Sequence, residues 1–228
     1  MNIKVISLGG SIIIPDKVNF KFLDKFKRLV ENHSDKYRFV IVAGGGSIAR
    51  RYISALRSEN KDKKSIALAG IRATRMNAMF LMQFFGRNLS NDVLPRNMTE
   101  VRNNLHKNKV VICGALRFSD NSTSDGTASK LARYLKSDFI NLTNVPGLYT
   151  SDPKTNRNAK IITKISWKDF NRMAQKIKFK PGQHFVLDQS AAAIIKKDRI
   201  KTYILGPNIR EVDSLLKNKR FVGTEISG

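Results

Sequence analysis

The stretch FVIVAGGGSIAR, residues 39–50, contains the pattern that decides the fold. Five apolar residues in a row, 39–43, predict a continuous apolar strand. Three glycines at 44–46 end this strand, and a helix is predicted from residue 47 to about residue 56. A strand, a glycine turn and a helix in this order are typical of α/β proteins, whose ligands bind beyond the carboxyl ends of the strands.

Similar apolar runs alternate with helical patterns along the rest of the chain. Further strands are predicted at residues 3–8, 110–113, 139–142, 185–187 and 202–205, with an edge strand at 220–226. Helices are predicted at residues 20–31, 65–85, 123–135, 189–197 and 209–216, and a capping box at 166–169 begins one more. Residues 61–64 are expected to form a linker. The alternation predicts an α/β protein with a mainly parallel sheet.

The composition describes a basic globular chain. Its 228 residues include 42 Lys and Arg against 18 Asp and Glu, a formal charge of +24. A single Cys excludes an intramolecular disulfide framework, and three well-separated His do not indicate a metal cluster. No apolar stretch approaches the roughly 20 residues that span a bilayer, so we expect a soluble cytoplasmic protein. The basic residues are spread along the chain, which favours a Lys-rich solvated surface over a small anionic ligand or nucleic acid.

Three predicted strands end in glycine, at Gly9-Gly10, at residues 44–46 and at Gly114. Glycine at such an end lets backbone N–H groups approach an anion closely, and the N-terminus of the next helix adds a favourable dipole. The loops match neither a Walker A loop nor a GxGxxG fingerprint. One such loop is more simply a tight turn without a ligand, but three together favour a ligand that carries phosphate.

The glycine loops stand among other motifs in a fixed order. The chain also carries GIRATRMNAM at 70–79, TSDGTA at 123–128, TNVPGLYTSDP at 143–153 and VLD at 186–188. Over nearly its whole length it resembles the amino acid kinase superfamily, and within it the archaeal-type uridylate kinases. The resemblance implies one domain over residues 1–228, a three-layer α/β/α sandwich with a mainly parallel central sheet. The acceptor-binding half would span about residues 1–140 and the ATP-binding half about residues 141–228.

The resemblance also implies an activity, the transfer of the γ-phosphoryl group of ATP to UMP, with Mg²⁺ arriving with ATP. ATP and UMP are then the partners of a homo-oligomer, a hexamer in typical relatives. The positions that match ATP contacts are Gly10, Ser11, Gly46, Arg50, Thr143, Asn144, Tyr149 and Asp152. The positions that match UMP contacts are Gly45, Arg75, Thr123 and Ser124, and Asp125 matches the acid that orders the reaction centre.

Some of these residues have a second interpretation. Arg75, on an otherwise apolar helix, either binds the acceptor phosphate or pairs with an acid across a subunit interface. Without the other motifs, Asp125 would be an ordinary acid in the first turn of a helix. The cation that stabilises the transferring phosphoryl group is not fixed by the resemblance, and the candidates are Lys4, Lys130 and Lys196.

The chain departs from the family pattern at several positions. Pro146 stands where the family loop usually has Asp, and Ala67 stands where archaeal-type enzymes place the Asp that holds the ribose of uridine. The loop at 115–122 looks longer than usual, and Ser7 replaces a Lys that many members have. These departures keep open a nucleotide-binding relative with weak catalysis. Isopentenyl phosphate kinases carry a His shortly after the triple glycine, and its absence from residues 47–50 argues against that acceptor.

Overall fold

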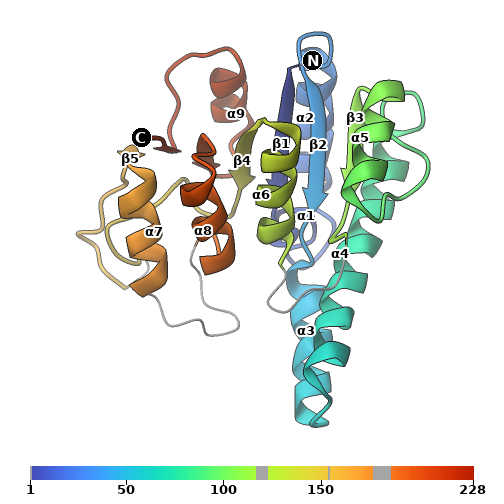
Figure 1. Cartoon of the computed structure of the whole chain (residues 1–228), viewed down its shortest axis with the longest axis horizontal. Coiled ribbons are helices and arrows are strands. Elements are labelled where there is room, and N and C mark those ends of the chain that lie inside the picture. The colour runs from blue at the N-terminus through green and yellow to red at the C-terminus, as the bar shows by residue number, and fades with distance from the viewer. Residues whose placement is uncertain (1, 117–122, 154, 177–185) are drawn as a thin grey trace.

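The computed structural model describes residues 2–116, 123–153, 155–176 and 186–228. Seven strands of this described part form one sheet in the order β3-β2-β1-β4-β6-β7-β5 (Figure 1). The strands are β1 (Ile3–Leu8), β2 (Arg38–Ala43), β3 (Val110–Cys113), β4 (Asp138–Leu142), β5 (Lys164–Ile165), β6 (Thr202–Leu205) and β7 (Thr224–Ile226). All neighbours pair in parallel except β6 and β7, which are antiparallel. The expected acceptor and ATP halves therefore contribute strands to a single sheet.

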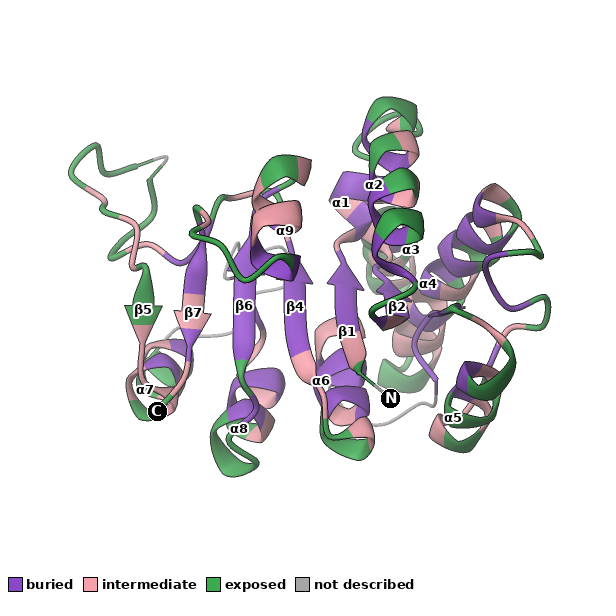
Figure 2. Ribbon diagram, turned by 90° about the horizontal axis from the view of Figure 1, so that it is seen from above, coloured by how far each residue is buried: buried purple, intermediate pink, exposed green. Residues whose placement is uncertain are grey.

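Helices cover both faces of this sheet. They are α1 (Gly10–Ile13), α2 (Phe20–His33), α3 (Gly46–Ser58), α4 (Lys63–Phe85), α5 (Met98–Lys107), α6 (Ser124–Leu135), α7 (Trp167–Lys176), α8 (Gln189–Lys197) and α9 (Ile209–Leu216). Figure 2 shows α1, α2 and α9 on one side of the strands and α5, α6, α7 and α8 on the other. The predicted three-layer sandwich is confirmed. Among the described residues, no helix has the length and apolar character needed to cross a membrane.

The two cores explain why the central strands read as unbroken apolar runs. Along β1 and β2, Ile6 and Ile41 pack beneath α2 and α4, whereas Val5 and Val40 pack beneath α6 and α8. All four side chains are fully buried. Burial of such a side chain stabilises the fold by about 1.5–3 kcal/mol. A strand with both faces buried is a continuous apolar run and does not alternate apolar and polar residues. The parallel sheet was predicted from such continuous runs.

Several predicted elements differ from the structure. Lys63 and Lys64 of the expected linker belong to α4, because the Asp62 side chain caps that helix by accepting from the Ser65 N–H at 3.0 Å. The predicted edge strand is β7, which lies between β6 and β5 rather than at the edge. The short helices α1 and α5 and the two-residue strand β5 were not predicted.

The strand predicted at 185–187 is wrong in its described part. Val186 and Leu187 form a bend rather than a strand, and residue 185 lies outside the described residues. The carbonyl of Val186 accepts from the side chain of Asn141 at 2.5 Å, so a side chain takes the place of a ladder partner. Asp188 then caps α8 directly. Val186 and Leu187 are therefore buried although they do not belong to a strand.

The outer edge of β3 is closed by residues 89–91: Val110 donates to the carbonyl of Leu89 at 3.1 Å and bridges in parallel to Ser90, and the Asn91 side chain continues this pairing. Asn91, which is 2% exposed, accepts from the Ile112 N–H at 2.6 Å and donates to the Ile112 carbonyl at 3.1 Å. Since an edge strand otherwise presents unpaired backbone groups, Asn91 acts as a substitute for the missing neighbour strand.

We predict that Asn91→Ala lowers the free energy of unfolding by about 2–4 kcal/mol, because two buried backbone groups of Ile112 lose their partners. Urea unfolding followed by circular dichroism measures the change. Asn103→Ala is the matched control, since Asn103 is an exposed residue of α5. Equal stabilities of the two variants would contradict the assigned role of Asn91.

Candidate functional site

The carboxyl ends of β1 and β2 meet through bare backbone. A Cβ atom placed on Gly10 would lie 2.1 Å from the nitrogen of Gly46 and 2.7 Å from the carbonyl oxygen of Gly44. Gly46 has a φ of +61°, in the left-handed region that favours glycine. Only glycine fits at these points of contact. We call the two segments that meet here, residues 9–11 and 44–46, the glycine floor. The N–H groups of Gly9 and Gly44 donate to backbone carbonyls of Leu142 and Leu8, whereas those of residues 10–11 and 45–46 lie at the N-termini of α1 and α3, where an anion is favoured.

Two further helix N-termini are joined to each other. The Thr123 hydroxyl accepts from the Gly126 N–H at 2.9 Å as the cap of α6, and it donates to the carboxylate of Asp188. Asp188 caps α8 by accepting from the Ala191 N–H at 2.9 Å, and it also accepts from the Ser190 hydroxyl at 2.6 Å. The positive ends of the α6 and α8 dipoles are therefore held together, an arrangement that suits phosphate groups.

Asp125 links the first turn of α6 to β1. Its carboxylate accepts from the Ser7 hydroxyl at 2.7 Å, which places it next to the glycine floor. Loss of contact with water raises the pKa of Asp125 to about 7, the negative charge of Asp188 adds to the rise, and the bond from Ser7 opposes it. Among the described residues, no ion pair neutralises Asp125 or Asp188. This site holds negative charge that a cation can compensate.

Asp188 is a site residue that the sequence reasoning did not single out. The motif VLD was noted as part of the resemblance, but no role was assigned to its acid. A signal was present, since an Asp directly before the helical run QSAAAIIKK is a typical N-cap. The effect of its charge on the pKa of Asp125 depends on the packing of α6 against α8, which local sequence does not reveal.

The predicted acceptor residues gather on one side of the floor. Gly45 caps α3, and Thr123 and Ser124 begin α6. The Arg75 guanidinium donates from Nε to the carbonyl of Ala115 at 3.0 Å and from Nη2 to the carbonyl of Leu116. Residues 117–122 of the acceptor loop lie outside the described residues.

The predicted ATP residues are less closely grouped. Gly10, Ser11 and Gly46 belong to the glycine floor, and Thr143 and Asn144 follow the carboxyl end of β4. Tyr149 bridges to Ile161, at the base of an excursion that contains Asp152 and extends past the β5 end of the sheet (Figure 2). Arg50 is exposed on α3. The ATP roles of these residues stay predictions.

The candidate cations can be placed as well. Lys4 forms an ion pair with Asp138 at 2.5 Å, at the starts of β1 and β4 and thus at the opposite edge of the sheet from the glycine floor. The candidacy of Lys4 is therefore wrong, because the remaining four residues of β1, 5–8, separate it from the floor. Lys130 lies in the middle of α6 and Lys196 near the end of α8.

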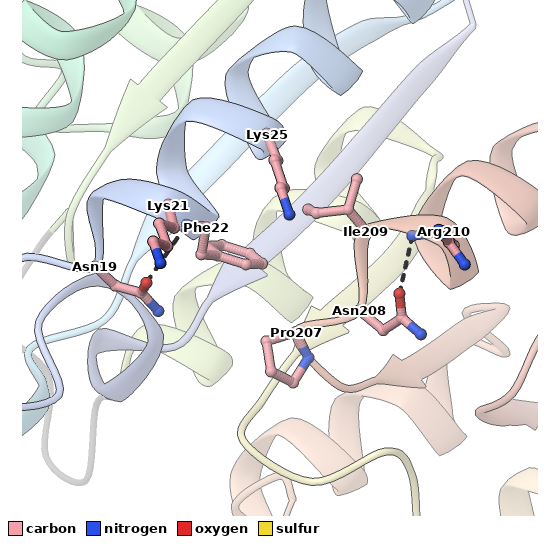
Figure 3. A pocket seen from close by; sticks show the side chains of 8 residues that line it. All are labelled: Asn19, Lys21, Phe22, Lys25, Pro207, Asn208, Ile209 and Arg210. Carbon is pink, nitrogen blue, oxygen red and sulfur yellow. Dashed lines mark hydrogen bonds between the residues drawn. The ribbon is translucent and has the colours of Figure 1, made fainter.

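A separate pocket of about 590 Å³ lies between α2 and α9. Figure 3 shows Lys21 and Lys25 of α2 on one side and Pro207, Ile209 and Arg210 on the other. None of the predicted site residues lines it. The glycine floor, rather than this pocket, is the point at which the motifs converge.

We predict that Asp125 titrates near pH 7 and that its pKa falls in Asp188→Asn, since Asn keeps the cap of α8 and removes the charge. A raised carboxyl pKa means that the folded chain binds more protons than the unfolded chain between about pH 4 and 7, so the free energy of unfolding decreases as pH rises through this window. Carbon NMR of the Asp125 carboxyl measures the titration directly.

Asp62→Asn is the matched control, because it changes the cap of α4 in the same way outside the site. It should leave the titration of Asp125 unchanged. A wild-type pKa of Asp125 below about 5 would contradict the proposed electrostatics.

Comparison with known proteins identifies the same family that the sequence motifs resemble. The profile of the amino acid kinase family matches residues 2–206. A protein called uridylate kinase from Pyrococcus abyssi is 34% identical over 206 residues, which cover 89% of each chain. The crystal structure of uridylate kinase from Archaeoglobus fulgidus superposes with a TM-score of 0.86 at 30% identity and covers all of both chains. UMP kinase from Ureaplasma parvum shares the fold, with a TM-score of 0.81 at 22% identity. Its fold, its ordered motifs and these relatives show that the chain belongs to the amino acid kinase family.

Proposed function

We propose that the protein transfers the γ-phosphoryl group of ATP to UMP and releases UDP and ADP. The observation that carries the proposal is the position of Asp125, which joins the glycine floor to the paired N-termini of α6 and α8. The relatives named uridylate kinase, at 31–34% identity over most of the chain, support UMP as the acceptor. The nucleotides would lie side by side beyond the carboxyl ends of β1, β2 and β4, where such sheets bind ligands.

The transfer needs positioning and charge neutralisation more than covalent chemistry. An oxygen of the UMP phosphate forms a bond to the γ-phosphorus, while the bond from that phosphorus to the β–γ bridging oxygen breaks and ADP leaves. The UMP phosphate is already anionic, so no general base is required. The N–H groups of the glycine floor and the N-termini of α6 and α8 stabilise the charge on the phosphoryl oxygens.

Magnesium fits the site as an ion that arrives with ATP. Asp125 and Asp188 supply carboxylate oxygens, the donors that Mg²⁺ prefers, and within the described residues neither has an ion-pair partner and no cluster of three or more ligating side chains occurs. The phosphates would therefore supply most of the ligands, with Asp125 and Asp188 holding the hydrated ion. The ion neutralises phosphate charge during the transfer.

The charge state of Asp125 links binding to activity. With its pKa near 7, the carboxyl group is protonated in a large fraction of the free protein at neutral pH. A bound cation favours the ionised form, so binding of ATP with its magnesium would complete the ionisation. In its ionised form, Asp125 would help to hold the cation that arrives with ATP.

One departure from the family pattern, Ala67, lies on the predicted acceptor side. Ala67 lies seven residues before Thr74 on α4 and thus on the same helix face, and Thr74 is a neighbour of Gly45. A ribose held there would lack the usual carboxylate. This observation supports the second candidate, a relative that binds nucleotides and turns over slowly.

We also propose a homo-oligomer, a hexamer as in typical relatives. The pair of helices α3 and α4 extends beyond the carboxyl edge of the sheet (Figure 1) and exposes three large apolar residues: Tyr52, Met76 and Met79. We assign these exposed apolar residues to the subunit interface of the proposed oligomer. A cytoplasmic location, where ATP and UMP are available, is part of the same proposal.

We predict the fastest release of ADP with UMP, in a coupled assay over nucleoside monophosphates, isopentenyl phosphate and amino acids. In Asp125→Asn, turnover should fall by about 100-fold or more, because the carboxylate that orders the cation is lost. Asp92→Asn, which changes an exposed loop residue, is the control and should keep the wild-type rate.

A faster rate on another acceptor would refute UMP as the substrate. ATP binding without turnover of any acceptor would favour the weakly catalytic relative. Wild-type rates in Asp125→Asn would show that Asp125 has no catalytic role and is only an acid in the first turn of α6.

A further inference from the structure

One turn of α4 touches both segments that are predicted to hold the acceptor. On one side, the Asn77 side chain donates to the carbonyl of Gly44 at 2.7 Å. On the other side, the Thr74 hydroxyl accepts from the Ala115 N–H at 2.9 Å, and Arg75 donates to the carbonyls of Ala115 and Leu116. The glycine floor and the segment after β3 are thus bonded to the same four residues of helix.

The packing on both sides of this turn leaves little room for adjustment. A Cβ atom on Gly114 would lie 2.7 Å from the nitrogen of Arg75 and 2.8 Å from the Thr74 hydroxyl. A Cβ atom on Gly45 would contact the Thr74 methyl group at 3.5 Å. The backbone after β3 therefore approaches α4 as closely as glycine allows, and the backbone after β2 lies in van der Waals contact with the same turn of α4. A shift of either segment requires these hydrogen bonds to break.

Arg75 contributes both geometry and charge. Its planar guanidinium can donate two bonds to carbonyls of adjacent residues, which a Lys ammonium cannot do with the same spacing. No ion pair in the described part of the chain involves Arg75. Desolvation lowers the pKa of Arg75, and the nearby charge of Arg96 lowers it further. Among the residues that the structure describes, no carboxylate neutralises the positive charge that Arg75 holds beside the acceptor segment.

We propose that Thr74, Arg75 and Asn77 form a spacer that fixes the acceptor segment after β3 relative to the glycine floor. Arg75 is then a positioning residue for the acceptor phosphate, acting through Ala115 and Leu116, and it has little influence on ATP. The inference rests on the proposed function, because it explains how the UMP-binding segment is held in position. It gives Arg75 a third role, distinct from a phosphate ligand and from an interface partner.

The test compares Arg75→Met and Thr74→Val with two matched variants. Arg75→Met removes the fork, and Thr74→Val removes the hydroxyl at nearly constant shape. Thr74→Ser keeps the hydroxyl, and Arg72→Met changes an exposed arginine on the same helix. Calorimetric titration with UMP and with a non-hydrolysable ATP analogue gives the two affinities, and hydrogen exchange reports the backbone at 110–116.

The spacer predicts a split between the two ligands. In Arg75→Met, the affinity for UMP and kcat should each fall on the order of tenfold or more, while the affinity for the ATP analogue changes by less than about twofold. Hydrogen exchange at Ala115 should become faster in Arg75→Met and in Thr74→Val. Arg72→Met should match the wild type, Thr74→Ser should keep the wild-type exchange at Ala115, and Arg75→Lys should recover only part of the UMP affinity.

The readouts separate this inference from the proposed function. Failure of the wild type to phosphorylate UMP would refute the function, whereas exchange at 110–116 would still report on the spacer. Loss of UMP affinity in Arg75→Met with unchanged exchange would make Arg75 a direct phosphate ligand and overturn the spacer. Equal loss of both affinities would also overturn it. If Arg75→Met does not fold, Thr74→Val and Arg75→Lys give the same comparison.

Discussion

The backbone of Gly10 lies directly against the backbone of Gly44 and Gly46, in a space that no Cβ atom could enter. This contact brings the ends of two parallel strands and the N-termini of α1 and α3 to one point. It is possible because β1 and β2 pair in register from Ile3 with Arg38 to Leu8 with Ala43, so both strands end at the same level. The site therefore depends on sheet register first and on side chains second.

Positive and negative groups lie close to one another around the glycine floor. Helix N-termini and Arg75 supply positive potential, whereas Asp125 and Asp188 supply two carboxylates without ion-pair partners among the described residues. Ser7 explains part of this imbalance, since a neutral hydroxyl occupies the position where many family members have a Lys. The basic residues that give the charge of +24 are spread along the chain, and in the proposed function their field would attract two phosphorylated substrates.

The sequence predicted those features that local pattern determines. The central strands were found because both of their faces are buried, and α6 and α8 were found from their helical pattern. The four-residue helix α1 and the position of β7 between two other strands were missed, because neither leaves a periodic signal. Within the site, the bond from Ser7 to Asp125 spans 118 residues and those from Arg75 end on backbone carbonyls. Such partners depend on three-dimensional packing and have no local sequence pattern.

The most direct test of the two-nucleotide site is a crystal structure with UMP, magnesium and a non-hydrolysable ATP analogue. We predict that the phosphates of both nucleotides lie on the glycine floor, facing the N-termini of α6 and α8, with Asp125 at the metal between them. Nucleotide phosphates bound elsewhere, for example between α2 and α9, with the glycine floor left unoccupied, would contradict the central claim.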